Sequence, residues 1–143
     1  VVSDHLKSRG FVLNDNSSRD VFLSGIMDVD KVAVHGSGNV YVRWVQSQLL
    51  QVNSNGTGMI RMAGVARDLR VRLYGNARFE GQYLRANDVM VRTAEVASAN
   101  VFPVKALQAF AYDYSNVFFY HSPISLNRMT MQSGNILQAG WRL

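Results

Sequence analysis

Hydrophobic and polar residues alternate along this chain in short runs, and the runs come in pairs separated by a turn signal. Val32 and Val34 precede the phrase HGSGN, and Val40 and Val42 follow it. A period of two is typical of a strand with one buried face, and Gly and Asn between two such runs indicate a turn. Each unit of the chain is therefore predicted to be strand, corner, strand.

The same unit recurs along the chain. Related corner phrases are SGNV at 37–40, NGTGMI at 55–60, YGNA at 74–77, SANV at 98–101, YSNV at 114–117 and SGNI at 133–136. Asn116 and Asn135 are 19 residues apart, and the distance from Asn39 to Asn76 corresponds to two such units. A repeat of about 20 residues indicates a solenoid, in which each coil covers the apolar interior of the next.

These patterns predict an all-β fold, a single-stranded parallel β-helix or solenoid of about six coils with strand-corner-strand repeats. Residues 1–143 are expected to form one domain, with 1–25 as an N-terminal cap, 26–136 as the repeat coils and 137–143 as a C-terminal tail containing Trp141. An antiparallel sandwich of short strands is the competing architecture. The recurrence of one phrase at one period favours the solenoid.

Alternation also assigns strand residues to the interior or to the surface. The residues expected to point inward before each corner are Val32, Val34, Leu50, Val52, Leu69, Val71, Leu73, Val89, Val91, Leu107, Ala109, Ala111, Met129 and Met131. Those expected to point inward after a corner are Val40, Val42, Ile60, Met62, Ala77, Phe79, Val117 and Phe119. Their neighbours, such as Arg70 and Met90, are expected to point outward.

The corners explain why Gly and Asn recur. A tight corner needs residues that accept a positive φ, which Gly does freely and Asn does best among the others. Asn side chains stacked from coil to coil are also expected to hydrogen-bond to each other or to neighbouring corners. The predicted corner residues are Gly36, Gly38, Asn39, Gly56, Gly58, Gly75, Asn76, Asn100, Asn116, Gly134 and Asn135.

The composition excludes several kinds of chemistry. The chain has no cysteine, so it holds no disulfide, no thiolate metal site and no cysteine nucleophile. The longest apolar stretch, 106–119, is interrupted by Asp113 and is shorter than the roughly 20 residues of a membrane-spanning helix. The sequence opens at Val1 without a leader peptide, which suggests a processed or trimmed product whose upstream signal or anchor is not in view.

No catalytic, cofactor or metal site is predicted. His5, His35 and His121 lack the spacing of metal ligands, and the Asp28 and Asp30 pair lacks the glycine and the closing glutamate of a calcium loop. A polysaccharide-cleaving enzyme would need clustered carboxylates. The acidic residues weighed for that role are expected on different coils and phases; they are Glu80, Asp88, Glu95 and Asp113. The chain is therefore predicted not to be an enzyme.

Arginine dominates the predicted outer surface. Seven arginines and three acids lie between Arg61 and Arg92, and the chain has a net charge of +5. In stacked coils, one strand face is expected to carry Arg43, Arg61 and Arg78, and another Arg72 and Arg92, with Arg70 also outward. Such a stripe suits an anionic partner, namely lipid headgroups, anionic glycans, nucleic acid or an acidic protein surface. Solvated strand surface is the simpler interpretation.

A second candidate surface is aromatic. Phe102, Phe110, Phe118 and Tyr120 are expected to point outward, and exposed aromatic residues in such numbers mark an interface, unless a C-terminal segment folds over them. Nucleic-acid binding would require basic and aromatic side chains interleaved on one face. Since the two groups are expected in different coils, nucleic acid is disfavoured as a partner.

Three longer segments resemble a bacterial β-solenoid family of largely unknown function, the putative auto-transporter adhesin head GIN domain. They are VAVHGSGNVYV, LRVRLYGNARFEG and VMVRTAEVASANVFPVKALQAFAYDYSNVFFYHSP, and the resemblance covers residues 25–136. The final YHSP resembles the Gly-x-Pro-like end of that family, although Ser122 stands where a glycine is usual, and Ala99 and Ser115 replace corner glycines. The resemblance implies an exported or envelope location in bacteria and implies no activity.

The sequence therefore predicts a non-catalytic structural or binding module at the bacterial periplasm, outer membrane or cell surface. Protein partners are expected, as in an accessory subunit of a larger envelope assembly such as a secretion system; an anionic glycan or a lipid headgroup is the other partner class. Surface adhesion or glycan binding is the alternative function, and a carbohydrate-active enzyme is third. Burial of the aromatic residues in an interface would favour a subunit, an open aromatic groove would favour glycan binding, and a convergent carboxylate pair would favour an enzyme.

Overall fold

The computed structural model describes residues 2–4, 11–15, 18, 20–27 and 29–139, and every regular element among them is a β-strand. The strands are β1 (Val2–Asp4), β2 (Phe11–Asp15), β3 (Val21–Met27), β4 (Val29–Val34), β5 (Val40–Ser54), β6 (Met59–Leu73), β7 (Arg78–Thr93), β8 (Ser98–Ala111), β9 (Asn116–Phe119), β10 (Ser125–Thr130) and β11 (Asn135–Gln138). None of these described residues belongs to a helix that could cross a membrane.

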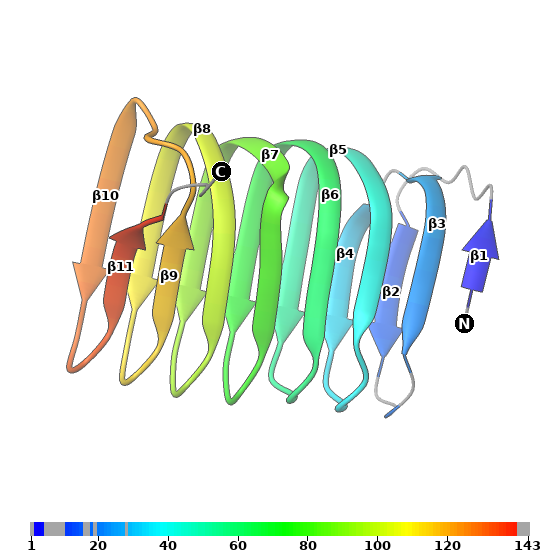
Figure 1. Cartoon of the computed structure of the whole chain (residues 1–143), viewed down its shortest axis with the longest axis horizontal. Coiled ribbons are helices and arrows are strands. Elements are labelled where there is room, and N and C mark those ends of the chain that lie inside the picture. Colours follow the sequence, from blue (N-terminus) through cyan, green and yellow to red (C-terminus); the bar gives the residue numbers. More distant parts are fainter. Residues whose placement is uncertain (1, 5–10, 16–17, 19, 28, 140–143) are drawn as a thin grey trace.

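The strands form one solenoid, as Figure 1 shows from the side. All described strand pairs are parallel, and the main path runs β1-β3-β5-β6-β7-β8-β9-β11, with β2, β4 and β10 paired beside it. The tight corners line up along one long edge of the stack, which we call the corner edge (Figure 1). The predicted parallel solenoid of about six coils is confirmed, and the antiparallel sandwich is wrong.

The central coils each have one tight corner and one bend inside a continuous strand, whereas a loop at 120–124 separates β9 from β10 in the last coil. Strands β5, β6 and β7 contain 15, 15 and 16 residues, and each curves from one layer of the solenoid into the other. The register shifts at these bends, for example between Val42 and Val45 and between Gly81 and Arg85. We call the opposite side of the solenoid the bend edge, the strand halves before it the leading face and those after it the trailing face.

Aliphatic side chains from both layers fill the interior. The predicted inward residues are at most 3% exposed, apart from the two methionines of the last coil; they are Val32, Val34, Val40, Val42, Leu50, Val52, Ile60, Met62, Leu69, Val71, Leu73, Ala77, Phe79, Val89, Val91, Leu107, Ala109, Ala111, Val117 and Phe119. The largest buried side chain lies beside small residues: Phe79 has Ala99 as its register partner, and a Cβ at Gly81 would overlap the Phe79 ring. These small residues leave the room that the ring needs.

The prediction for Met129 and Met131 is wrong. These side chains are 52% and 55% exposed. Strand β10 pairs with β8 so that Met129 lies opposite Phe110, an outward residue, and Arg128 lies opposite the buried Ala109. The alternation in β10 therefore has the opposite phase, and Met131 belongs to the corner that follows.

The role predicted for Asn at positive φ is also wrong. Equivalent corner positions have a positive φ at Gly75, Glu95, Asp113 and Gln132, with angles of 70°, 61°, 58° and 59°. Asn76 follows the first of these and is not among the described residues with positive φ. Gly56 instead permits close stacking, since a Cβ there would overlap the carbonyl oxygen of Gly36. Gly58 has the same relation to Gly38, and Gly134 lies against the backbone of Ala111.

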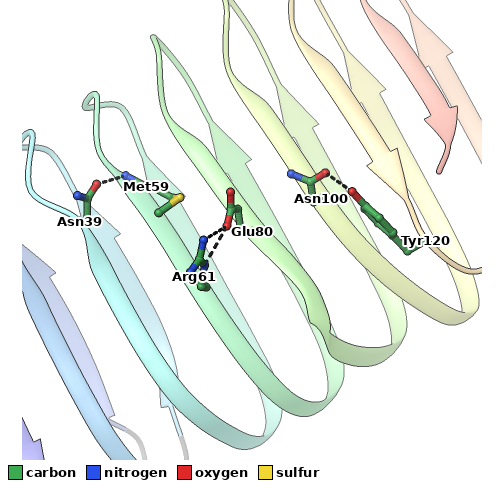
Figure 2. Close-up of polar contacts among 6 residues, drawn as sticks. All are labelled: Asn39, Met59, Arg61, Glu80, Asn100 and Tyr120. Atoms are coloured by element: carbon green, nitrogen blue, oxygen red, sulfur yellow. Dashed lines mark hydrogen bonds and ion pairs between the residues drawn. The ribbon is translucent and has the colours of Figure 1, made fainter. Parts of the chain in front are cut away.

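The recurring Asn side chains do bond between coils. Asn135 donates from Nδ2 to Oδ1 of Asn116 at 3.0 Å, and Asn39 Oδ1 accepts the backbone N–H of Met59 at 2.9 Å (Figure 2). Asn116 and Asn135 are the first residues of their strands. Asn100 lies within β8 and not at a corner, because that coil turns earlier, through 94–97.

The predicted domain limits and caps stay predictions, and the described residues near both ends include strands. Strands β1, β2 and the beginning of β3 fall within the segment 1–25, and they pair in parallel with β3, β4 and β5. The described residues of that segment therefore extend the coils. At the other end, β11 includes residues 137 and 138, whereas Trp141 lies outside the described residues.

A substitution at Gly64 tests whether the bend requires a glycine. The φ of Gly64 is +134°, and a Cβ there would overlap the backbone of Val45 in the preceding coil. Gly64→Ala is expected to lower the free energy of unfolding by about 1–3 kcal/mol. Chemical denaturation followed by circular dichroism measures the change, with Val65→Ala, an exposed neighbour, as the control expected to stay within about 0.5 kcal/mol. Equal midpoints for both variants would contradict the proposed constraint.

A substitution at Gln132 tests whether the corner requires a positive φ at this position. Gln132 is exposed, and its φ of 59° is one that Gly adopts without steric cost. Gln132→Gly is therefore expected to raise the free energy of unfolding by roughly 0.5–1 kcal/mol, because relief of strain exceeds the entropy that Gly adds to the unfolded chain. The matched change Ser133→Gly lies at a position without positive φ and is expected to destabilise. Stabilisation by both variants, or by neither, would refute the assignment.

Candidate binding groove

Two adjoining hollows form a groove between the leading face and the bend edge. The first has a volume of about 270 Å³ and is lined by Phe22, Leu23, Tyr41, Val42, Arg43, Arg61, Met62, Ala63 and Tyr83. The second has a volume of about 540 Å³ and is lined by Trp44, Ala63, Gly64, Val65, Gln82, Tyr83, Arg85 and Phe102. Because Ala63 and Tyr83 belong to both, we treat them as one site, the aromatic groove.

Strand register assembles the first hollow. Phe22, Tyr41 and Arg61 occupy equivalent positions on β3, β5 and β6, so they lie side by side at the strand spacing of about 4.8 Å. The rings of Phe22 and Tyr41 stack with centroids 4.9 Å apart and planes 9° apart. The guanidinium of Arg61 lies 6.0 Å from the Tyr41 centroid and continues the row. The result is a continuous row of stacked side chains, partly aromatic, across three strands.

Glu80 fixes the position of Arg61. The carboxylate Oε2 of Glu80 accepts hydrogen bonds from Nε and Nη2 of Arg61 at 2.9 and 2.7 Å (Figure 2). This hydrogen bonding, with the charge of the carboxylate, raises the pKa of Arg61 above its ordinary value, so the group stays charged. Among the described residues Arg61 and Glu80 form the one ion pair, and Arg43 beside them has none.

Stacked rings and a cation form the second hollow. The guanidinium of Arg85 lies 5.6 Å from the Phe102 centroid, and the His121 ring stacks on Phe102 with centroids 5.0 Å apart. Nδ1 of His121 lies 2.9 Å from the carbonyl oxygen of Pro103 and carries the proton, because a carbonyl only accepts. Phe102 is therefore held from both sides.

One buried acceptor in the groove lacks a protein partner. Oε1 of Gln82 is inaccessible and accepts no hydrogen bond from any described residue. Buried polar groups are nearly always paired, so this oxygen calls for a donor such as a buried water. Gln82 belongs to the wall that also carries Tyr83, Arg85 and Phe102.

The structure places the predicted arginines on different parts of the solenoid. Arg61 and Arg78 both lie on the leading face, yet Arg78 is in register with Met59 and Ser98 and so stands nearer the corner. Arg43 lines the groove. On the trailing face Arg72 and Arg92 are register partners, as their predicted common face requires, and the guanidinium of Arg92 lies 5.5 Å from the Phe110 centroid. Arg70, on the same face, lies beside Gln51 and Met90.

The predicted aromatic residues do not form one patch. Phe118 lies on the leading face beside Asn100, which accepts a hydrogen bond from the Tyr120 hydroxyl at 3.2 Å (Figure 2). Phe110 lies on the trailing face, and Phe102 lies at the bend. All four are half-buried, and an arginine, a histidine or an asparagine from a neighbouring coil contacts them.

The sequence interpretation missed most of the groove. Phe22, Tyr41, Trp44 and Tyr83 were not singled out, although Phe22 and Tyr41 are separated by the same 19 residues as Asn116 and Asn135. An alignment of outward positions at the repeat period would have placed those two rings side by side. Tyr83 and Trp44 lie where the register shifts, so the period gives no warning of their approach.

A carboxylate pair was also missed. Asp68 and Asp88 are register partners on the trailing face, although the acids were expected on different coils and phases. They line a hollow of about 200 Å³ with Arg70, Met90 and Gln108. Within the described part of the chain no group of three or more His, Asp or Glu side chains is arranged to hold a metal ion.

Comparison with solved structures shows where the fold occurs elsewhere. The crystal structure of a putative lipid binding protein from Parabacteroides distasonis matches with a TM-score of 0.90 at 20% identity, over 96% of this chain and 57% of that one. The crystal structure of a putative adhesin from Bacteroides fragilis matches with a TM-score of 0.68 at 20% identity, over 85% of this chain and 60% of that one. This chain thus spans less than two thirds of either protein, and at this identity the likeness concerns the fold.

Comparison with protein families gives a direct match. No curated protein matches the chain. The family described as "Putative auto-transporter adhesin, head GIN domain" matches residues 12–123, from β2 to the loop after β9. That span includes the aromatic groove and every repeat phrase except SGNI at 133–136. The chain belongs to the putative auto-transporter adhesin, head GIN domain family, as its resemblance predicted.

Proposed function

We propose that this chain is a non-catalytic binding module of the bacterial cell envelope, of the adhesion type, and that its aromatic groove binds the sugar rings of a surface glycan. The observation that supports this most directly is the groove itself, in which Phe22, Trp44 and Tyr83 keep exposed ring surface beside two hollows. Pockets that bind small molecules are concave and mostly apolar, with few polar groups that set orientation. The groove has this composition.

The groove matches the chemistry of a sugar. The exposed ring of Tyr83 and the outer edge of the Phe22–Tyr41 stack offer apolar surface to the C–H face of a pyranose, and the tyrosine hydroxyls offer hydrogen bonds. Arg43 supplies donors for hydroxyl or carboxylate oxygens. A glycan with acidic groups fits best, since the described residues that line the groove include arginines and no acid.

The other candidate functions and ligands have less support than glycan binding. An accessory subunit of a secretion system would present its aromatic residues as one interface, yet Phe110 and Phe118 lie on opposite faces. A lipid chain is a second candidate ligand, because Leu23, Val42 and Met62 line the first hollow. The fold neighbour described as a putative lipid binding protein is consistent with it. An exported location, at the periplasm, outer membrane or surface, is proposed from the adhesin family.

Removal of the groove's rings tests the proposal. Tyr41→Ala and Tyr83→Ala are each expected to weaken glycan binding by about ten-fold, the equivalent of roughly 1.4 kcal/mol, because each deletes apolar contact surface that lines the groove. Screening on a glycan array followed by titration calorimetry of the best ligand measures the effect. Tyr74→Ala, which removes an exposed tyrosine at the corner edge, is the control expected to leave affinity unchanged. Equal losses in all three variants, or binding of fatty acid and no glycan, would overturn the proposal.

The carboxylate pair provides a separate test for catalysis. The wild-type chain is expected to release no reducing ends from any glycan that it binds, because the groove and the Asp68–Asp88 pair lie on different parts of the solenoid. Reducing-end assays over long incubation measure this. Hydrolysis that is abolished by Asp68→Asn or Asp88→Asn, with Asp20→Asn unaffected, would instead establish an enzyme.

A further inference from the structure

The corner edge carries exposed apolar side chains on successive corners. They are Tyr74, Val96, Tyr114 and Met131, and Tyr114 is 70% exposed. The corners stack directly: the N–H of Val96 donates to the carbonyl of Gly75, and that of Tyr114 to the carbonyl of Glu95. Corners are normally built from small polar residues, so large apolar tips on four of them in sequence are unusual.

Arginines flank this edge on both sides. Arg72 and Arg92 are register partners on the trailing face, two residues before their corners. Arg78 follows a corner directly and opens β7 on the leading face. None of the three forms an ion pair with a described residue. Their exposed guanidinium groups therefore stand beside the apolar tips without neutralising partners.

Two acids lie on the same edge and oppose the arginines in part. Glu95 is exposed, and Asp113 accepts the backbone N–H of Glu95 through Oδ2 at 3.0 Å. Three arginines against two acids leave the edge weakly positive, in a chain with a net charge of +5. This small excess of positive charge predicts that the corner edge needs its apolar side chains as well as its arginines to bind an anionic partner.

We propose that the corner edge docks on a membrane surface containing anionic phospholipids. The tyrosine, valine and methionine tips would enter the interfacial region, where aromatic side chains are favoured, while Arg72, Arg78 and Arg92 meet the headgroup phosphates. Each arginine near such a surface contributes about 1 kcal/mol at moderate ionic strength. Two signals acting together, apolar insertion and charge, give peripheral and reversible binding.

This placement leaves the aromatic groove accessible. The second hollow lies at the bend edge, and a strand half of about seven residues, roughly 20 Å, separates it from the corner edge. The first hollow begins nearer the corners, at Tyr41 and Arg61, but it opens on the leading face of β3, β5 and β6, whereas the apolar tips belong to the corners that follow β6. A solenoid resting on its corner edge therefore presents the second hollow away from the lipid and leaves the first open on the side of the stack. The two surfaces share none of the residues named for either, so docking on a membrane does not depend on the proposed glycan binding.

Vesicle sedimentation tests the inference. Vesicles of phosphatidylcholine with a third phosphatidylglycerol are expected to retain the chain at low salt, and pure phosphatidylcholine vesicles to retain little. The double variant Arg72→Gln/Arg92→Gln is expected to bind about 25-fold more weakly, five-fold for each arginine. Tyr114→Ser is expected to bind the anionic vesicles several-fold more weakly than the wild type. This loss is expected to be the same at low and at high salt, because the deleted contact carries no charge.

Two matched variants control for net charge and for exposed tyrosine. Arg43→Gln/Arg85→Gln removes the same charge from the groove side, and Tyr83→Ala removes an exposed ring there. Both variants are expected to bind vesicles like the wild type. Circular dichroism melts confirm that all variants fold. Equal losses from both double variants would show unspecific attraction, and no retention on anionic vesicles would overturn the proposal. Because glycan binding is measured without lipid, either proposal can fail alone.

Discussion

Parallel, in-register stacking of coils is the constraint on which the rest of this molecule depends. Each strand binds its predecessor along the whole backbone, so a residue in one coil lies about 4.8 Å from its equivalents in the next. Inward columns must therefore be filled by residues of complementary volume, as Phe79 is beside Ala99. Outward rows place unlike side chains next to one another. The sequence from Phe22 through Tyr41 and Arg61 to Glu80 is one such row, and it forms both the floor of the groove and its ion pair.

Stacking also explains which features the sequence could predict. Alternation and corner phrases recur in every coil, so the solenoid and the buried columns from Val32 to Phe119 followed from the pattern alone. Features that depend on a single coil did not. In β10 a shift of one residue exchanges the faces of Met129 and Arg128, which no period near twenty can resolve. At the corner, the recurring Asn drew attention away from the residues that hold the positive φ, Glu95 and Asp113, which lie five and three residues before Asn100 and Asn116.

The arginines show the same limit in electrostatic form. Composition reveals an excess of positive charge, but the partner of each guanidinium comes from an adjacent coil. Arg61 is paired with Glu80, Arg85 and Arg92 lie over phenylalanine rings, and Arg72 has no acidic partner among the described residues. Basic and aromatic groups in different coils are thereby brought within contact distance, although sequence separation had suggested that they lie apart. Strand register, and not the number of charges, therefore decides which arginine lacks a partner within the protein and can bind an anionic ligand.

Contacts in this molecule are mostly made between adjacent coils, and this gives the solenoid a direction in which it is mechanically weak. Tension applied at the two ends of the stack would load each interface between coils in series, and the weakest one would open first. The aromatic groove crosses those interfaces, with lining residues from β3, β5, β6, β7 and β8. A ligand lying along it would bridge several coils at once and act as a noncovalent clamp. Occupancy would then strengthen the solenoid against separation of its coils, so that the bound molecule resists pulling better than the free one.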